Sequence, residues 1–290
     1  MSTPARIAAA ILVTTASVLV LVLAPGATDA YAANLMGPLR APGEPAFIAA
    51  HRGDRASAPE NTVPAFEAAV LSGSDFLETD VQLTADGYPV LMHDTTVDRT
   101  TNGSGRVADL TLAELRTLDA GSWYDAAFTG IQVPLFDEFL DILVRSPEVT
   151  ALVELKDEWS ADDVETLMGG IYFRGVQDRI VFAAFSPNTV TALQEVAPAI
   201  PRVMLRRVLP VDPVEVAGRY GAIAIMTRAS ALEARPDAVA EMHAAGLGVL
   251  VYTLNSEDRW SEALAYGVDG IVTDEPSALD EWIAATAPGT

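Results

Sequence analysis

Cysteine is absent from this chain of 290 residues. That absence excludes disulfide bonds, a thiol nucleophile, a zinc site built on cysteine and a lipidated N-terminal cysteine. Basic residues are also few, because 18 lysines and arginines face 40 aspartates and glutamates and leave a net charge of −22. Such a charge argues against nucleic acid or an anionic membrane surface as a general partner. An anionic substrate therefore needs cations that are placed locally.

Histidine is scarce as well, with three residues in the chain. Two of them, His51 and His93, stand on either side of the carboxylates Glu78 and Asp80. Imidazole carries protons near neutral pH, and carboxylate oxygens bind hard divalent cations. This stretch therefore supplies the groups that an acid–base phosphoester enzyme needs. The third histidine, His243, lies in a helical pattern, and we interpret it as a surface or packing residue without a catalytic role.

The N-terminal residues predict a targeting segment rather than part of the fold. Arg6 precedes the apolar run Ile7–Ala24, and Ala30–Ala32 has the A-x-A form of a cleavage site. We therefore expect residues 1–32 to be a signal peptide and the protein to be secreted or extracytoplasmic. The apolar run is nearly long enough to span a bilayer, so an uncleaved membrane anchor is the alternative. Residues 33–45, rich in Pro and Gly, predict a lead-in to the fold.

The rest of the chain alternates short apolar runs with helical patterns. Eight runs are strand-like: Phe47–Ala50, Phe76–Val81, Ala151–Leu155, Ile180–Phe185, Arg202–Leu205, Ala222–Met226, Gly248–Leu254 and Gly270–Thr273. Helical patterns between them include Val63–Leu71, Asp162–Met168, Thr189–Val196, Pro236–Ala245 and Arg259–Tyr266. This alternation predicts an α/β fold, a (β/α)8 TIM barrel over residues 46–288, whose reactive side chains lie at the C-terminal ends of the strands.

Two segments depart from the plain repeat. The residues after Asp80 contain the turn Asp86-Gly87 and then an apolar run to Met92, which predicts a hairpin with a returning strand. Such a hairpin would set His93 near Asp80. Residues 95–134 are polar and contain glycine, with a short helical signal at Leu112–Leu118. We expect this segment to be a small insertion over the barrel mouth, after the strand that leads to His93.

Several motifs occur in one order along the chain. They are A-H-R-G with A-P-E-N-T-V-P-A-F, E-T-D-V-Q-L-T-A-D-G-Y-P-V-L-M-H-D, D-R-T-T-N-G-S-G, V-E-L-K, V-Y-T-L-N and G-I-V-T-D-E-P. Together they resemble the glycerophosphodiester phosphodiesterase family, within the phospholipase C-like barrel group. The resemblance runs from Phe47 to about Leu279. Any one motif would be weak evidence, whereas their shared order is specific.

The resemblance implies an activity and the groups that transfer protons. Similar enzymes hydrolyse glycerophosphodiesters to glycerol 3-phosphate and an alcohol, and His51 and His93 correspond to their two acid–base histidines. The closing strand of such enzymes often carries Trp where Tyr252 stands here. That departure bears on how the glycerol or the head group of the substrate packs.

The resemblance also implies a divalent cation, Ca2+ or Mg2+, bound by Glu78, Asp80 and Glu154, with Arg52 and Lys156 in contact with the phosphate. The residue types alone favour the same kind of ion, because oxygen-only ligation suits a hard cation and disfavours zinc. They leave calcium and magnesium undecided. A cation on a phosphate oxygen would neutralise developing charge, and Arg52 could add a bidentate grip.

Lys156 is distinctive without reference to any family. It is the only lysine, and the other 17 basic residues are arginines. It follows a strand-like run, two residues after Glu154, so alternation puts both side chains on one face. We therefore expect Lys156 to point inward, and the alternative is a surface lysine without a role.

The other candidates have structural alternatives. His51 and His93 could be hydrogen-bonded histidines that cap strand ends. Glu78 and Asp80 could form salt bridges with Arg52, and Arg52 could serve only to neutralise them. Under these alternatives, the same residues lie at the mouth of the barrel but take no part in catalysis.

The loop after His51 contains Glu60, Asn61 and Thr62. We expect Glu60 and Asn61 to orient the histidine or a metal ligand, and the alternative is that Asn61 or Thr62 merely caps the following helix. Trp123 in the insertion is a candidate for the substrate rim, together with Tyr252, or else part of the core of the insertion.

The sequence thus predicts a metal-dependent phosphodiesterase that acts on a small-molecule glycerophosphodiester. One alternative is phospholipase D-like or C-like action on lipid or lysolipid, which the mostly polar insertion disfavours because such enzymes need an apolar rim. The other is a non-catalytic barrel that binds a phosphodiester, which the retention of both histidines, all three carboxylates and the lysine disfavours. Contact with a membrane is expected only through an uncleaved N-terminal segment.

Overall fold

The computed structural model describes residues 35–286. The predicted signal peptide or anchor at residues 1–32 lies outside this range. Nine strands form one sheet: β1 (Phe47–Ala50), β2 (Phe76–Leu83), β3 (Pro89–Leu91), β4 (Thr150–Leu155), β5 (Ile180–Ala184), β6 (Arg202–Arg206), β7 (Ala224–Arg228), β8 (Gly248–Tyr252) and β9 (Gly270–Thr273). Their hydrogen-bonded order is β1-β9-β8-β7-β6-β5-β4-β2-β3, and an additional β1–β2 pairing closes the sheet.

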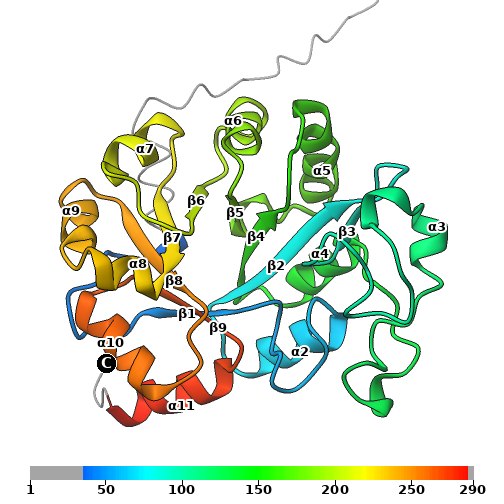
Figure 1. The fold of residues 1–290 in the computed structure, drawn as a ribbon, viewed down its shortest axis with the longest axis horizontal. Helices are drawn as coiled ribbons and strands as arrows, with labels where there is room; N and C mark the ends of the chain where they lie inside the picture. Colours follow the sequence, from blue (N-terminus) through cyan, green and yellow to red (C-terminus); the bar gives the residue numbers. More distant parts are fainter. Residues whose placement is uncertain (1–34, 287–290) are drawn as a thin grey trace, which may run out of the picture.

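The closed part of the sheet is parallel, and β3 alone among these strands runs antiparallel, against β2. Helices connect the parallel strands, and Figure 1 shows them as a ring around the barrel in chain order. They are α2 (Val63–Leu71), α4 (Phe136–Arg145), α5 (Ala161–Arg174), α6 (Pro187–Val196), α7 (Pro213–Arg219), α8 (Ala229–Ala234), α9 (Ala238–Ala244), α10 (Glu257–Tyr266) and α11 (Pro276–Thr286). The short helix α3 (Leu112–Leu115) belongs to the insertion and lies at the side of the barrel. The predicted (β/α)8 TIM barrel is confirmed.

Alternation along the strands sets which side chains fill the barrel. A buried interior cluster takes every second residue of most strands, such as Phe47 and Ala49 of β1 and Val203 and Leu205 of β6. The residues between these point outward and pack against the helices. The strands are therefore apolar on both faces, which is why they appear in the sequence as continuous apolar runs. Beyond the apolar part of the strands, the next inward-facing positions are polar and lie at the mouth of the barrel.

The predicted hairpin is present. β3 pairs with the end of β2, with Leu91 opposite Val81, and the turn between them uses a positive φ of 81° at Gly87. Beyond β3, the insertion packs around a small core of its own that includes Val97, Val107 and Leu115. In Figure 1 it lies at the side of the barrel next to β2 and β3. It borders the mouth through Thr95 and Thr96, which line the cavity described below.

The residues before β1 cover the opposite end of the barrel. Met36 belongs to the interior cluster. The backbone N–H of Arg40 donates to Asp269 Oδ1 at 2.8 Å, and that of Gly43 donates to the carbonyl of Leu264 at 2.7 Å. These contacts fix the lead-in against the end from which β9 starts. Within residues 35–286, no helix is long and apolar enough to cross a membrane.

Candidate active site

The C-terminal ends of the strands surround a cavity of about 630 Å3. Its walls include six of the residues predicted for proton transfer, phosphate binding or the metal: His51, Arg52, Glu78, His93, Glu154 and Lys156. These residues come from the ends of β1, β2, β3 and β4. A chain segment of about 100 residues is thus folded so that its polar side chains converge, as expected for the C-terminal face of such a barrel.

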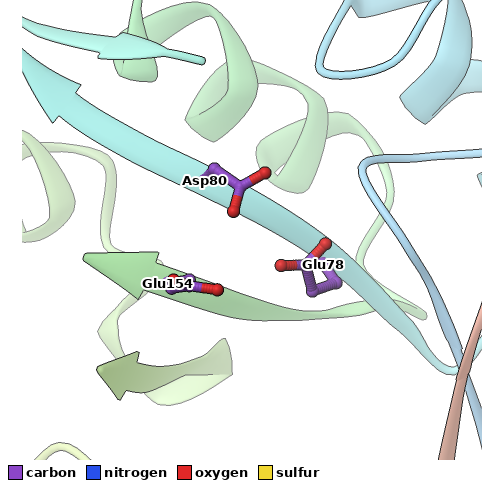
Figure 2. A group of neighbouring side chains, drawn as sticks. All are labelled: Glu78, Asp80 and Glu154. Atoms are coloured by element: carbon purple, nitrogen blue, oxygen red, sulfur yellow. The ribbon is translucent and has the colours of Figure 1, made fainter. Parts of the chain in front are cut away.

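Three carboxylates lie together at one side of the cavity. Glu78 and Asp80 are two residues apart on β2, and Glu154 lies on the neighbouring strand β4, where it is directly opposite Asp80. Figure 2 shows the three side chains on these two adjacent strands. One oxygen from each lies within 4.8 Å of the others, and all three residues are buried. The alternation of two parallel strands therefore produces an oxygen-only cluster.

The electrostatics of this cluster are those of crowded anions. Burial and the nearby charge of Asp80 raise the pKa of Glu154 to about 7 and raise the pKa of Glu78 as well. Burial opposes ionisation of Asp80, but Lys156 and Arg52 outweigh it and lower the pKa of that carboxyl. Asp80 Oδ1 is nevertheless buried without a hydrogen-bond partner among the described residues. An additional cation would satisfy this oxygen and relieve the repulsion.

Arg52 is held by carboxylates on two sides. It occupies a left-handed conformation with φ 60°, and its backbone N–H donates to Glu78 Oε2 at 2.8 Å. Its guanidinium pairs with Glu60 at 2.7 Å and with Asp80 at 3.2 Å. The alternative in which Arg52 forms salt bridges with the acidic residues therefore describes part of its environment. Arg52 also lines the cavity, so an anion that binds there would lie against its side chain.

Lys156 points into the site, as the alternation predicted. Its Nζ lies 2.8 Å from Glu154 Oε1 and 3.3 Å from Asp80 Oδ1. These carboxylates raise the pKa of Lys156 in spite of its burial, so the ammonium stays charged. Its side chain is 16% exposed, which contradicts the alternative of a surface lysine.

His51 is positioned by a carboxylate from the last strand. Its Nδ1 lies 2.6 Å from Asp274 Oδ1, and Asp274 also accepts hydrogen bonds from Arg55 and Asn255. Burial lowers the pKa of His51 to about 4 despite this hydrogen bond, so the ring is neutral at pH 7. A neutral ring that donates from Nδ1 has a basic Nε2, which is the form a proton acceptor needs.

His93, which follows β3, has an equivalent arrangement. Its Nδ1 lies 2.7 Å from Asp94 Oδ1, and Arg99 Nε donates to the second oxygen of Asp94 at 2.6 Å. The backbone N–H of Met92 donates to the carbonyl of Asp80, so the hairpin sets His93 beside this carboxylate. Burial lowers the pKa of His93 as well. Each histidine therefore has its own carboxylate at Nδ1.

Glu60 and Asn61 support these residues rather than cap a helix. Asn61 Nδ2 donates to Asp80 Oδ2 at 2.9 Å, and its amide oxygen accepts from Thr79 Oγ1 at 3.0 Å. Thr62 is the N-cap residue of α2, but its side chain makes no capping hydrogen bond and donates to the carbonyl of Pro59. The predicted N-cap position of Thr62 is therefore confirmed, whereas neither its side chain nor that of Asn61 makes a capping hydrogen bond. Glu60 is the common partner of Arg52, Arg55 and Arg99.

Three other candidates lie in different settings. Tyr252 lines the cavity, whereas Trp123 is outside its lining, and the Trp123 ring packs edge-on against Tyr124 within the insertion. His243 lies at the far end of the barrel, where its Nε2 is 2.9 Å from Asp269. A second cavity of about 520 Å3 at that end is lined mainly by apolar residues, with Asp269 as its acidic group.

Several polar groups of the site were not singled out from the sequence. Asp274 directly follows β9, as His51 follows β1, so its position at a strand end was a usable signal. Asp94 directly follows His93, so its position was a usable signal as well. Arg99 gave no comparable signal, because its contact with Glu60 depends on how the insertion folds back over the loop after β1. The same is true of Arg55, which joins Glu60 to Asp274.

The chain is similar to known proteins in both sequence and fold. Residues 51–278 match the sequence profile of the Glycerophosphoryl diester phosphodiesterase family. A glycerophosphodiester phosphodiesterase of Caldanaerobacter subterraneus subsp. tengcongensis is 32% identical over 235 residues, which cover 80% of this chain and 96% of the relative. A crystal structure of glycerophosphodiester phosphodiesterase from Agrobacterium tumefaciens str. C58 has a TM-score of 0.71 at 31% identity and covers 82% of this chain and 100% of that one.

A phosphodiesterase of Oleispira antarctica, solved in complex with the product sn-glycerol-3-phosphate, is similar as well. It has a TM-score of 0.78 at 28% identity, with 82% of this chain and 96% of that chain covered. The similarity therefore extends over nearly the whole length of each of these proteins.

Proposed function

Since the chain belongs to the glycerophosphoryl diester phosphodiesterase family, we propose that it hydrolyses glycerophosphodiesters to glycerol 3-phosphate and an alcohol. The observation that carries this proposal is the convergence of two carboxylate-bound histidines on a buried cluster of three carboxylates and two cations. A binding protein has no need for two proton carriers in one cavity with an anion site.

A divalent cation fits this cluster. Glu78, Asp80 and Glu154 would hold it, and their oxygens are the ligands that Ca2+ and Mg2+ prefer. When bound, such an ion polarises a phosphate oxygen and neutralises charge that develops in the reaction. Three carboxylates face the two cations Arg52 and Lys156, so a divalent ion would turn a negative site into one with a single positive charge, which suits a phosphodiester monoanion.

The remaining residues bind the phosphate and transfer protons. Arg52 and Lys156 donate hydrogen bonds to the phosphate oxygens from opposite edges of the cluster. One histidine removes a proton from the attacking oxygen, while the other donates a proton to the oxygen that leaves, and both act through Nε2 because Nδ1 is engaged. Each of these proton transfers increases the reaction rate by about two to four orders of magnitude.

Action on intact lipid is the second candidate, and the insertion argues against it. The residues of the insertion that reach the cavity are Thr95 and Thr96, which are polar. An enzyme that works on a bilayer needs an apolar rim at its mouth. Small water-soluble diesters are therefore the substrates that we propose.

We also propose that residues 1–32 direct export and are removed. The support for this is the apolar run Ile7–Ala24 and the A-x-A sequence that follows it. Expression of the full chain in a bacterial host, followed by N-terminal sequencing of the protein from the medium or the periplasm, tests the proposal. A mature N-terminus at Ala33 is expected, and a protein that stays in the membrane with Met1 intact would contradict it.

The catalytic proposal is tested by histidine substitution. We expect His51→Ala and His93→Ala each to lower kcat for glycerophosphocholine by about two to four orders of magnitude, because each removes a proton-transfer group. The measurement is release of glycerol 3-phosphate with Ca2+ or Mg2+ and, separately, with a chelator, which should abolish turnover. His243→Gln is the matched control and should retain the parent rate, since His243 lies at the other end of the barrel. Parent-like rates in both alanine variants would refute the assigned roles.

A further inference from the structure

The half of the mouth opposite the carboxylates contains two arginines. Val203 and Leu205 of β6 and Ala224 and Met226 of β7 belong to the barrel interior. The same alternation continues one step further to Arg207 and Arg228, and both line the cavity. Strand geometry that places Glu154 and Lys156 on one side of the mouth thus places two guanidinium groups on the other.

These arginines lack the partners that other cations of the mouth have. Arg52, Arg55 and Arg99 all pair with carboxylates. Within residues 35–286, neither Arg207 nor Arg228 has a carboxylate oxygen within 4.0 Å. The chain has 40 acidic residues and 18 basic ones, yet these two arginines have no acidic partner. They therefore give this part of the cavity wall a local positive charge.

Other side chains of this half hold the arginines and add a polar group. The Arg207 guanidinium lies over the Phe185 ring, 4.5 Å from its centroid, which orients it while its N–H groups stay available. Tyr252 Oη is buried without a hydrogen-bond partner among the described residues. Tyr252 lines the same cavity as Arg207 and Arg228. Burial raises the pKa of Tyr252, and the charges of the two arginines oppose this rise. A ligand oxygen would satisfy all three groups.

We infer that Arg207, Arg228 and Tyr252 form a subsite for the alcohol part of the diester, and that this subsite selects an alcohol with a negative charge of its own. The inference rests on the proposed function, which places the scissile phosphate between Arg52 and Lys156. The two substituents of the phosphate must then occupy the rest of the cavity. Glycerol is uncharged and gives no reason for two arginines, whereas an alcohol that carries a phosphate or a carboxylate does. A quaternary ammonium group would be repelled.

The test compares three substrates that differ in the charge of the alcohol. With the full-length protein and a saturating divalent cation, kcat/KM should be about tenfold higher for glycerophosphoinositol 4-phosphate than for glycerophosphoinositol, because one or two charge-assisted hydrogen bonds are gained. Glycerophosphocholine should give the lowest value. Equal values for the two inositol compounds in the parent would overturn the inference.

Variants assign this preference to the two arginines. Arg207→Gln and Arg228→Gln should each reduce the ratio between the inositol substrates toward one and change glycerophosphoinositol turnover by less than about threefold. Both residues are exposed, so the substitutions leave the core intact. Arg145→Gln, on the outer face of α4, is the matched control and should keep the parent ratio. An equal loss for all substrates would place the arginines on the scissile phosphate and overturn the inference.

A binding measurement separates this inference from the catalytic proposal. Calorimetric titration with myo-inositol 4-phosphate, the alcohol alone, requires no turnover. Binding by the parent that weakens in Arg207→Gln and Arg228→Gln, but not in Arg145→Gln, supports the subsite even if no diester is hydrolysed. Binding of the same strength in all four proteins would refute it, whatever the activity.

Discussion

Two buried glutamates at the mouth show how partners decide the charge of a residue. Burial by itself raises the pKa of any carboxyl group. For Glu154 this effect is reinforced by Asp80, and the pKa is raised to about 7. For Glu60 the hydrogen bond from Arg99 and the charges of Arg52 and Arg55 outweigh burial, and the pKa is lowered to about 2. Glu60 is therefore a fixed anion that organises the surrounding arginines.

The arrangement around Glu60 predicts a pH-dependent contribution to stability. A carboxyl whose folded pKa is about 2 and whose unfolded pKa is near 4.5 stabilises the fold above pH 4.5, and this contribution is lost as the pH falls from 4.5 toward 2. We expect Glu60→Gln to lower the free energy of unfolding at pH 7 by about 2–4 kcal/mol, because it leaves buried guanidinium groups without a counter-charge. Urea unfolding from pH 7 to pH 4 measures this difference.

The change of this stability difference with pH has a predicted sign. The difference between the parent and Glu60→Gln should be about 1 kcal/mol smaller at pH 4 than at pH 7. Glu67→Gln is the control, since Glu67 forms an exposed pair with Arg145 and should contribute less than about 0.5 kcal/mol. A gap between parent and Glu60→Gln that widens at pH 4 would contradict the assigned charge.

At the scale of elements, the sequence was most informative where periodicity decides the structure. The eight parallel strands and the hairpin to His93 follow from apolar runs and one Asp-Gly turn, so they could be predicted. Contacts between the first and the last strand could not be predicted in this way, because they exist only once β1 pairs with both β2 and β9. His51 and Asp274 are an example, since 223 positions separate them in the chain. The strand-end position of Asp274 predicts that it lies at the mouth of the barrel, but not that it contacts His51.

The bounds of β7 differ from the predicted ones at the end of the strand that borders the mouth of the barrel. β7 runs from Ala224 to Arg228, whereas the apolar run predicted Ala222–Met226. The shift arises because Thr227 and Arg228 pair with Arg206 and Tyr252 although they are polar. A prediction based on hydrophobicity ends a strand at its last apolar residue. It therefore excluded Arg228, the polar end of β7 that lines the cavity.

The pairing of β1 with β9 predicts the effect of a glycine substitution. Gly270 of β9 lies directly opposite Phe47 of β1, and a Cβ at Gly270 would come within 2.2 Å of the Phe47 ring. That ring is confined by Phe76, with 4.6 Å between centroids, so it has little room to move. We expect Gly270→Ala to lower the free energy of unfolding by about 1–3 kcal/mol, measured by chemical denaturation.

Gly169→Ala is the matched control for this substitution. Gly169 lies on the exposed side of α5, with nothing within 4 Å of a Cβ, and alanine there should raise stability by about 0.5–1 kcal/mol through helix propensity. Opposite signs for the two substitutions are therefore expected. If Gly270→Ala is as stable as the parent, the close approach of β1 and β9 at this position is wrong.

At the scale of the whole molecule, the net charge of −22 acts in two ways that can be separated. Repulsion among surface carboxylates destabilises the compact state, and salt screens it over a Debye length of about 8 Å at physiological ionic strength. The three carboxylates of the mouth are buried, so salt screens them poorly. A divalent ion bound by these carboxylates would relieve their repulsion directly. General screening and specific binding should therefore add to each other.

This separation gives a prediction for the melting temperature. Raising NaCl from about 10 to 150 mM should raise the Tm of the parent and of Glu154→Gln by similar amounts, since screening acts over the whole surface. About 1 mM CaCl2 or MgCl2, at constant ionic strength, should raise the Tm of the parent further, because an ion bound only to the folded state stabilises it by mass action. Glu154→Gln removes one of three ligands and should lose most of this second increase. A full response to the divalent ion in Glu154→Gln would mean that the ion acts at the acidic surface and not at the cluster of Glu78, Asp80 and Glu154.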